Sequence, residues 1–206
     1  MIPVFLSVGR VESASHSAFV EALENRLATF EIELRRAKNS HHSPLEKIRR
    51  EMARCEATII VAHERLYLND AVEFRGAGAK ENSITGKALP TVWNHIEAML
   101  ALEKQHPLLV FCEEHIKEEG MLEPVGSYYV HRVPFTLEYL GSRDFGEIIA
   151  EWLEDIRKRK SWTDRISRAF RSSFMDGIDN IAPLIGIIAI LMGLAYWLGS
   201  TFGGLP

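Results

Sequence analysis

Trp93 and Glu97 are the residues whose types and spacing best fit catalytic chemistry. They lie four positions apart in a stretch predicted to be helical from Thr91 to about Lys104, so both side chains fall on one helical face. A carboxylate beside an indole and inside a helix could be partly desolvated, with a raised pKa. Such a carboxylate can stabilise or trap a sugar oxocarbenium ion. The alternative is that Trp93 packs on a sheet and Glu97 is solvated beside it.

Motifs of several other enzyme classes are missing from the sequence. It has no Gly-x-Gly-x-x-Gly after the first strand and no Walker loop, which argues against a Rossmann dehydrogenase or a P-loop enzyme. It also has no Gly-x-Ser-x-Gly elbow. The adjacent pair His41-His42 lacks convincing partners, and Cys55 and Cys112 form no metal-binding pattern. We therefore expect no metal site, and a buried, reduced thiol at Cys112.

The elements that must position these side chains alternate between strands and helices. Strands are expected at residues 4–8, 32–34, 57–62, 108–112 and within 128–136. Helices are expected at residues 16–30, 44–52, 91–104 and 144–157. Ser43 is the expected N-cap of the second helix, with Pro44 at its first position and Glu46 closing a capping box. The alternation predicts an α/β domain of flavodoxin-like type, with a largely parallel sheet and helices on both faces.

Ligands of such sheets bind beyond the carboxyl ends of the strands. Three segments should lie there, namely residues 7–15, 37–43 and 62–93. Within the last of these, residues 64–89 are mostly polar and contain three glycines, so an irregular lid or binding loop is expected.

Four sequence features together resemble the Toll/interleukin receptor (TIR) family. They are Phe5-Leu6-Ser7 on the first strand, Ser43-Pro44-Leu45 opening the second helix, the strand at residues 58–61 and Trp93-x-x-x-Glu97. The sequence is most similar to bacterial TIR-like domains related to nucleoside deoxyribosyltransferases. The resemblance covers about residues 1–157, and the Trp-x-x-x-Glu element is its most specific part.

The resemblance implies a role for each of these residues. In that family the glutamate is the catalytic residue of NAD glycohydrolases, so Glu97 would be catalytic and NAD a substrate, with no resident cofactor. Trp93 would brace the helix at the nucleotide site. Ser7 and Arg10 would touch ribose or phosphate, although Arg10 could also be a plain surface charge. Residues 36–42 would close over the nucleotide and contact a neighbouring subunit.

Two features depart from the family pattern. Pro3 stands where many members have Asp, and the segment 64–89 is longer than usual.

The expected function is a membrane-anchored TIR-like N-glycosidase of NAD or a related nucleotide, acting in antiphage defence. Two rivals stay open: a non-catalytic signalling module that self-associates, and a sensor that couples a nucleotide signal to a membrane helix.

A single C-terminal membrane span is expected at residues 181–202. These 22 residues carry no charge and are long enough to cross about 30 Å of hydrocarbon. A buried helix of a soluble core is the alternative. Residues 158–180 before the span form a basic, amphipathic linker, which could lie on the bilayer surface or be solvated.

The distribution of charge supports this arrangement. Residues 156–206 contain seven basic and three acidic residues, whereas residues 1–155 carry a net charge of −8. The basic flank places the N-terminal domain on the cytoplasmic side. The acidic body argues against nucleic acid as a partner. The expected partners are a lipid bilayer, a nucleotide and further copies of the chain.

Overall fold

The computed structural model of the protein describes residues 1–37, 43–123 and 128–162. The chain divides into a compact unit of residues 1–156 and a second unit of residues 157–206, of which residues 157–162 are described and helical. Over the described ranges, no helix is both long and apolar enough to cross a membrane. The span expected at residues 181–202 and the linker beyond residue 162 lie outside the described residues.

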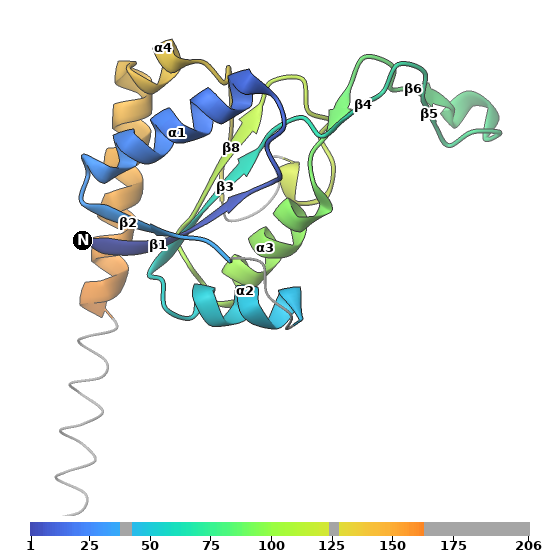
Figure 1. The fold of residues 1–206 in the computed structure, drawn as a ribbon. Coiled ribbons are helices and arrows are strands. Elements are labelled where there is room, and N and C mark those ends of the chain that lie inside the picture. The colour runs from blue at the N-terminus through green and yellow to red at the C-terminus, as the bar shows by residue number, and fades with distance from the viewer. Residues whose placement is uncertain (38–42, 124–127, 163–206) are drawn as a thin grey trace, which may run out of the picture. The chain divides into compact units, whose positions relative to one another are not determined.

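The unit of residues 1–156 is built around a sheet of five parallel strands (Figure 1). The strands are β1 (Ile2–Val8), β2 (Ile32–Arg35), β3 (Ala57–Ala62), β8 (Leu108–Glu113) and β9 (Val130–Val133). Their order is β2-β1-β3-β8-β9, which is the 2-1-3-4-5 order of flavodoxin-like sheets. The predicted α/β architecture with a parallel sheet is confirmed.

Helices cover both faces of the sheet (Figure 1). One face carries α1 (Ala14–Ala28), α4 (Leu137–Leu140) and the helix that begins at residue 143. The other carries α2 (Pro44–Met52), α3 (Val92–Glu103) and the short helix η2 (Gly120–Leu122). Alternate residues of β3 divide between the two cores, with Ile59 and Val61 on the α1 side and Ile60 and Ala62 on the other. A strand buried on both faces is a nearly continuous apolar run, and every residue of β3 except Thr58 is apolar, which is why β3 could be predicted with its observed bounds.

Short polar side chains begin the helices that matter for the site. The Ser13 hydroxyl caps α1 by accepting a hydrogen bond from His16 N–H at 3.1 Å, and Thr91 caps α3 through Trp93 N–H at 3.4 Å. Helix α2 begins at Pro44 as predicted. The predicted capping box is wrong, because the Ser43 side chain makes no capping bond.

The segment 64–89 is more ordered than the sequence predicts. It contains two small antiparallel pairs, β4 (Leu66–Tyr67) with β7 (Ala88–Leu89) and β5 (Val72–Glu73) with β6 (Asn82–Ser83), and one turn, η1 (Gly78–Lys80). Figure 1 shows the β5–β6 end reaching away from the sheet. Gly76, Gly78 and Gly86 have a left-handed backbone, which glycine adopts without steric cost, and this conformation allows the tight turns of the segment. The pairs leave apolar side chains exposed at Leu66, Tyr67 and Phe74.

Candidate functional site

The predicted site residues Ser7 and Glu97 meet at the carboxyl edge of the sheet. Ser7 is the second-last residue of β1 and is paired in register with Ile60 of β3. In a sheet with the 2-1-3-4-5 order, the direction of winding reverses between β1 and β3, and ligands bind at that reversal. Helix α3 packs against β1 and β3 on one face of the sheet, and it places Glu97 in contact with Ser7.

The Glu97 carboxyl is buried and hydrogen bonded. The residue is 9% exposed, and the Ser7 side chain hydrogen bonds to it. Burial raises the pKa of Glu97 to about 7, and the bond from Ser7 opposes part of that rise by favouring the ionised form. Of the two alternatives left open by the sequence, the desolvated Glu97 is the one that the structure shows, and the solvated Glu97 is not observed.

Trp93 does not lie in the core, and its predicted role of bracing the helix stays a prediction. Its side chain is 41% exposed at the start of α3. The buried stripe of the helix runs through Asn94, Glu97, Ala98, Leu100 and Ala101. Trp93 is four residues from Glu97 but lies at the margin of this stripe, so the i, i+4 rule correctly predicts that the two are neighbours and does not predict which one is buried.

Asn94 is the site residue that the sequence analysis missed. It is 1% exposed, and its Nδ2 lies 3.1 Å from Ser7 Oγ and 3.4 Å from the carbonyl oxygen of Val61. Its Oδ1 is buried and has no partner within the described part of the chain. An asparagine in the first turn of a helix is an ordinary residue in sequence, so only its burial against β1 and β3 could reveal the contact.

Arg10 is not brought together with Ser7 and Glu97. Its side chain is 89% exposed and pairs with Glu12, with 2.5 Å between Arg10 Nε and Glu12 Oε1. An ion pair this exposed contributes little to stability. The structure thus favours the surface-charge alternative for Arg10. The segment 36–42, expected to close over the nucleotide, lies outside the described residues from residue 38 on.

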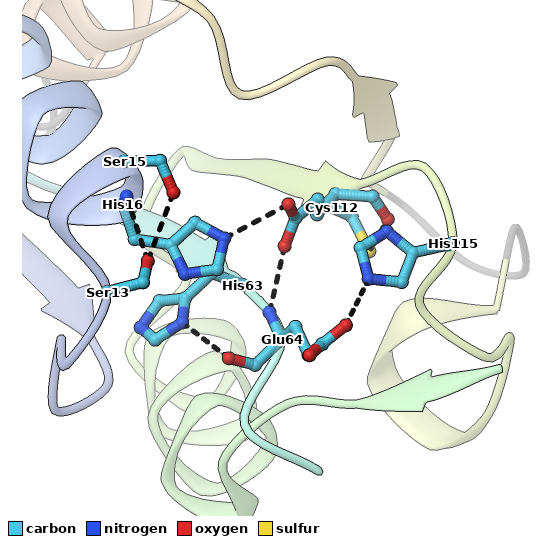
Figure 2. Close-up of polar contacts among 8 residues, drawn as sticks. Ser13, Ser15, His16, His63, Glu64, Cys112 and His115 are labelled. Atoms are coloured by element: carbon cyan, nitrogen blue, oxygen red, sulfur yellow. Dashed lines mark hydrogen bonds and ion pairs between the residues drawn. The ribbon is translucent and has the colours of Figure 1, made fainter. Parts of the chain in front are cut away.

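A second polar cluster joins three elements at the same edge of the sheet (Figure 2). The Glu113 carboxylate at the end of β8 accepts two hydrogen bonds, from His16 Nε2 at 3.0 Å and from the backbone N–H of Glu64 at 2.9 Å. The Glu64 side chain in turn lies 2.6 Å from His115 Nε2. One carboxylate therefore ties the start of α1 to the ends of β3 and β8.

His63 lies beside this cluster and is held in one tautomer. It is 4% exposed, and its ring centroid is 5.0 Å from that of His16. Its Nδ1 lies 3.0 Å from the Glu64 carbonyl oxygen, which can only accept, so Nδ1 carries the proton. Nε2 has no partner among the described residues. It abuts Gly9, where an added Cβ would lie 3.2 Å from His63 Nε2 and 3.1 Å from Thr91 Cγ2.

The described side chains do not suggest metal or thiol chemistry at this edge. Among them, no group of three or more His, Cys, Asp or Glu side chains is arranged to hold a metal ion. Cys55 and Cys112 are both free and buried, and burial raises the pKa of each thiol to about 11. Thiols of this kind are poor nucleophiles. The arrangement is suited instead to acid–base and electrostatic work by Glu97.

Comparison with known proteins adds no family assignment. No protein-family model matches the chain, and no curated protein matches it.

Proposed function

We propose that this protein is a TIR-like nucleotide N-glycosidase of the NAD glycohydrolase type, with Glu97 as its catalytic residue. The observation that carries the proposal is the buried Glu97 carboxyl, hydrogen bonded to Ser7 at the carboxyl edge of a flavodoxin-like sheet. A buried carboxyl with a pKa near neutrality is costly to maintain, and such groups gather at functional sites.

The chemistry would cleave the bond between the ribose C1′ and the nitrogen of nicotinamide. The electron pair of that bond leaves with the nicotinamide nitrogen, and the sugar becomes an oxocarbenium ion. A water oxygen then bonds to C1′, and its proton passes to the Glu97 carboxylate. A base with a pKa of about 7 suits this step, because it is substantially ionised at neutral pH and still holds a proton well.

Burial also supports electrostatic stabilisation of the sugar cation. The negative charge of ionised Glu97 acts in a region that largely excludes water, where charge–charge interactions are stronger than in solution. The Ser7 hydroxyl holds the carboxylate in place and would leave the other lone pairs of Glu97 for the sugar or the water. Trp93 lies one turn away with part of its ring exposed, and in this proposal it contacts the nucleotide.

The location of the enzyme is part of the proposal. Residues 181–202 would anchor it in a membrane as a single span, and the basic linker before them would keep the catalytic domain on the cytoplasmic side. Anchored copies would assemble in the plane of the bilayer. Antiphage defence is the role that the TIR resemblance suggests for such an assembly.

One observation favours the rival function of a self-associating signalling module. Several large apolar side chains are exposed on the unit of residues 1–156, including Leu66, Tyr67 and Phe74 on the segment 64–89. Exposed apolar groups gathered on one segment are typical of protein interaction sites. Such a module would need no turnover, so an activity measurement separates the two functions.

The deciding experiment uses the full-length protein in detergent micelles or nanodiscs. It is incubated with NAD and a panel of related nucleotides, and the released base is measured by chromatography. Glu97→Gln should lower the release by at least about 100-fold, the scale of losing one preorganised electrostatic group. Glu103→Gln is the matched control, since Glu103 is exposed on the same helix. Full activity in folded Glu97→Gln, or no release from any nucleotide by the wild type, would contradict the proposal.

A further inference from the structure

The orientation of the Asn94 side chain follows from its neighbours. One of its terminal atoms faces both Ser7 Oγ, at 3.1 Å, and the carbonyl oxygen of Val61, at 3.4 Å. A carbonyl oxygen only accepts hydrogen bonds, so the atom facing it must be the NH₂ group. The same NH₂ group therefore donates to the Ser7 hydroxyl oxygen.

This contact makes the Ser7 oxygen an acceptor toward Asn94 and leaves the Ser7 proton to be donated to another group. A serine hydroxyl has one proton to donate, and its oxygen can accept. Since the oxygen accepts from Asn94, the proton is available for the carboxylate of Glu97, to which Ser7 is bonded. The bonds form a directed chain from the Asn94 amide through the Ser7 hydroxyl to the Glu97 carboxylate.

We propose that Asn94 is a positioning residue that acts through Ser7, orienting the hydroxyl so that its proton is held on the Glu97 carboxylate. Asn94 does not need to touch the substrate in this role. The bond that it directs favours the ionised form of Glu97, which the proposed reaction uses as its base, so the value of the role to catalysis rests on the proposed function. The hydrogen-bond chain itself does not.

The test follows the titration of Glu97 by NMR in the full-length protein in micelles, with carbon-13 at the glutamate carboxyls. The signal of Glu97 is assigned by its loss in Glu97→Gln. Ser7→Ala should raise the titration midpoint by roughly one pH unit or more, because a hydrogen bond to the charged form is removed. Asn94→Leu, which keeps the size and removes the amide, should raise it in the same direction. Asn25→Leu, on the exposed face of α1, should leave it unchanged.

The double variant Ser7→Ala/Asn94→Leu decides whether Asn94 works through Ser7. If it does, the double variant should titrate like Ser7→Ala alone, because nothing is left for Asn94 to orient. Equal shifts from Asn94→Leu with and without Ser7 would overturn the proposal. So would an unchanged midpoint in folded Asn94→Leu. If Asn94→Leu does not fold, Asn94→Ala replaces it under the same criteria: it should raise the midpoint of Glu97 in the wild-type background and leave that of Ser7→Ala unchanged.

These outcomes do not depend on turnover. A protein that releases no base from any nucleotide would contradict the proposed function, and the titration would still show whether Asn94 directs Ser7. Where base release is found, the pH of half-maximal rate should move with the NMR midpoint, upward in Ser7→Ala and Asn94→Leu and not in Asn25→Leu.

Discussion

The Ser7 side chain on β1 hydrogen bonds to the Glu97 carboxyl on α3, and the two residues lie 90 positions apart in the sequence. The contact places a buried carboxyl at the reversal of winding between β1 and β3, where sheets of this order bind their ligands.

The stability of the protein should depend on pH through Glu97. The folded-state pKa of about 7 lies above the ordinary value of 4.5, so the folded state binds more protons than the unfolded state between these values. Stability should therefore fall as pH rises from 4.5 to 7, and the full cost of ionising Glu97 applies above pH 7. Glu97→Gln should raise the free energy of unfolding at pH 8, by up to about 3 kcal/mol, and change it little near pH 4.5.

Denaturant unfolding of the full-length protein in detergent at pH 4.5 and pH 8 measures this difference. Glu103→Gln, at an exposed position of α3, is the control and should give the same small change at both pH values. An equal effect of Glu97→Gln at the two pH values would mean that the carboxyl is not desolvated.

Trp93→Ala should be mild for a tryptophan substitution. The ring is 41% exposed, so its removal should cost about 1 kcal/mol or less of unfolding free energy. Phe111→Ala provides the contrast, because Phe111 is fully buried and its loss should cost about 3–5 kcal/mol. Thermal or denaturant unfolding compares the two. A loss of several kcal/mol in Trp93→Ala would instead support the prediction that this ring braces the helix.

Gly9→Ala should destabilise the carboxyl edge of the sheet. The new methyl group would lie 3.1 Å from Thr91 Cγ2 and 3.2 Å from His63 Nε2, so both side chains would have to move. Overpacking of this kind costs about 1–3 kcal/mol. Gly146→Ala is the matched control, since nothing lies within 4 Å of that position and it is helical, where Ala is favoured by about 0.5–1 kcal/mol. Opposite signs in an unfolding assay are expected, and equal effects would contradict the observed packing.

Glu113→Ala should loosen the junction between β3, β8 and α1. It removes the acceptor of both His16 Nε2 and Glu64 N–H, and each unpaired donor that stays buried costs about 1–3 kcal/mol. Glu113→Gln keeps an oxygen for one of the donors and should cost less. Hydrogen exchange at the Glu64 amide checks this directly, with the fastest exchange expected in Glu113→Ala. Glu114→Ala, at an exposed neighbouring position, should leave that amide protected as in the wild type.

Deleting residues 181–206 should release the protein from membranes. These residues contain the uncharged stretch 181–202, which is long enough to cross a bilayer. The full-length protein should sediment with membranes and enter the supernatant only with detergent, whereas the shortened chain should remain in the supernatant without it. A full-length protein that stays in the supernatant would contradict the anchor.

The sequence by itself determined the α/β class and most of the element positions. The strand at 57–62 and the helices beginning near Pro44 and Thr91 were predicted within a residue or two, because apolar runs, periodicity and helix starts are local signals. It also singled out Ser7 and Glu97, and it left open whether Glu97 is desolvated or solvated, which its 9% exposure in the structure answers. The strand pairs within 64–89 were missed, since strands of two residues leave no periodic pattern.

Only the tertiary structure decided which side chains meet. The contacts of Ser7 with Glu97 and Asn94 depend on the register of β1 against β3 and on the rotation of α3 about its axis. Neither the register nor the rotation can be predicted from local sequence. Asn94 is buried and Trp93 is half-exposed although the two are adjacent in the chain, because successive side chains of a helix point about 100° apart around its axis. The junction of His16, Glu64 and Glu113 likewise exists only because the parallel sheet brings the ends of β3 and β8 to one edge. Long-range polar contacts of this kind arise from the packing of whole elements, which is why no spacing in the sequence predicts them.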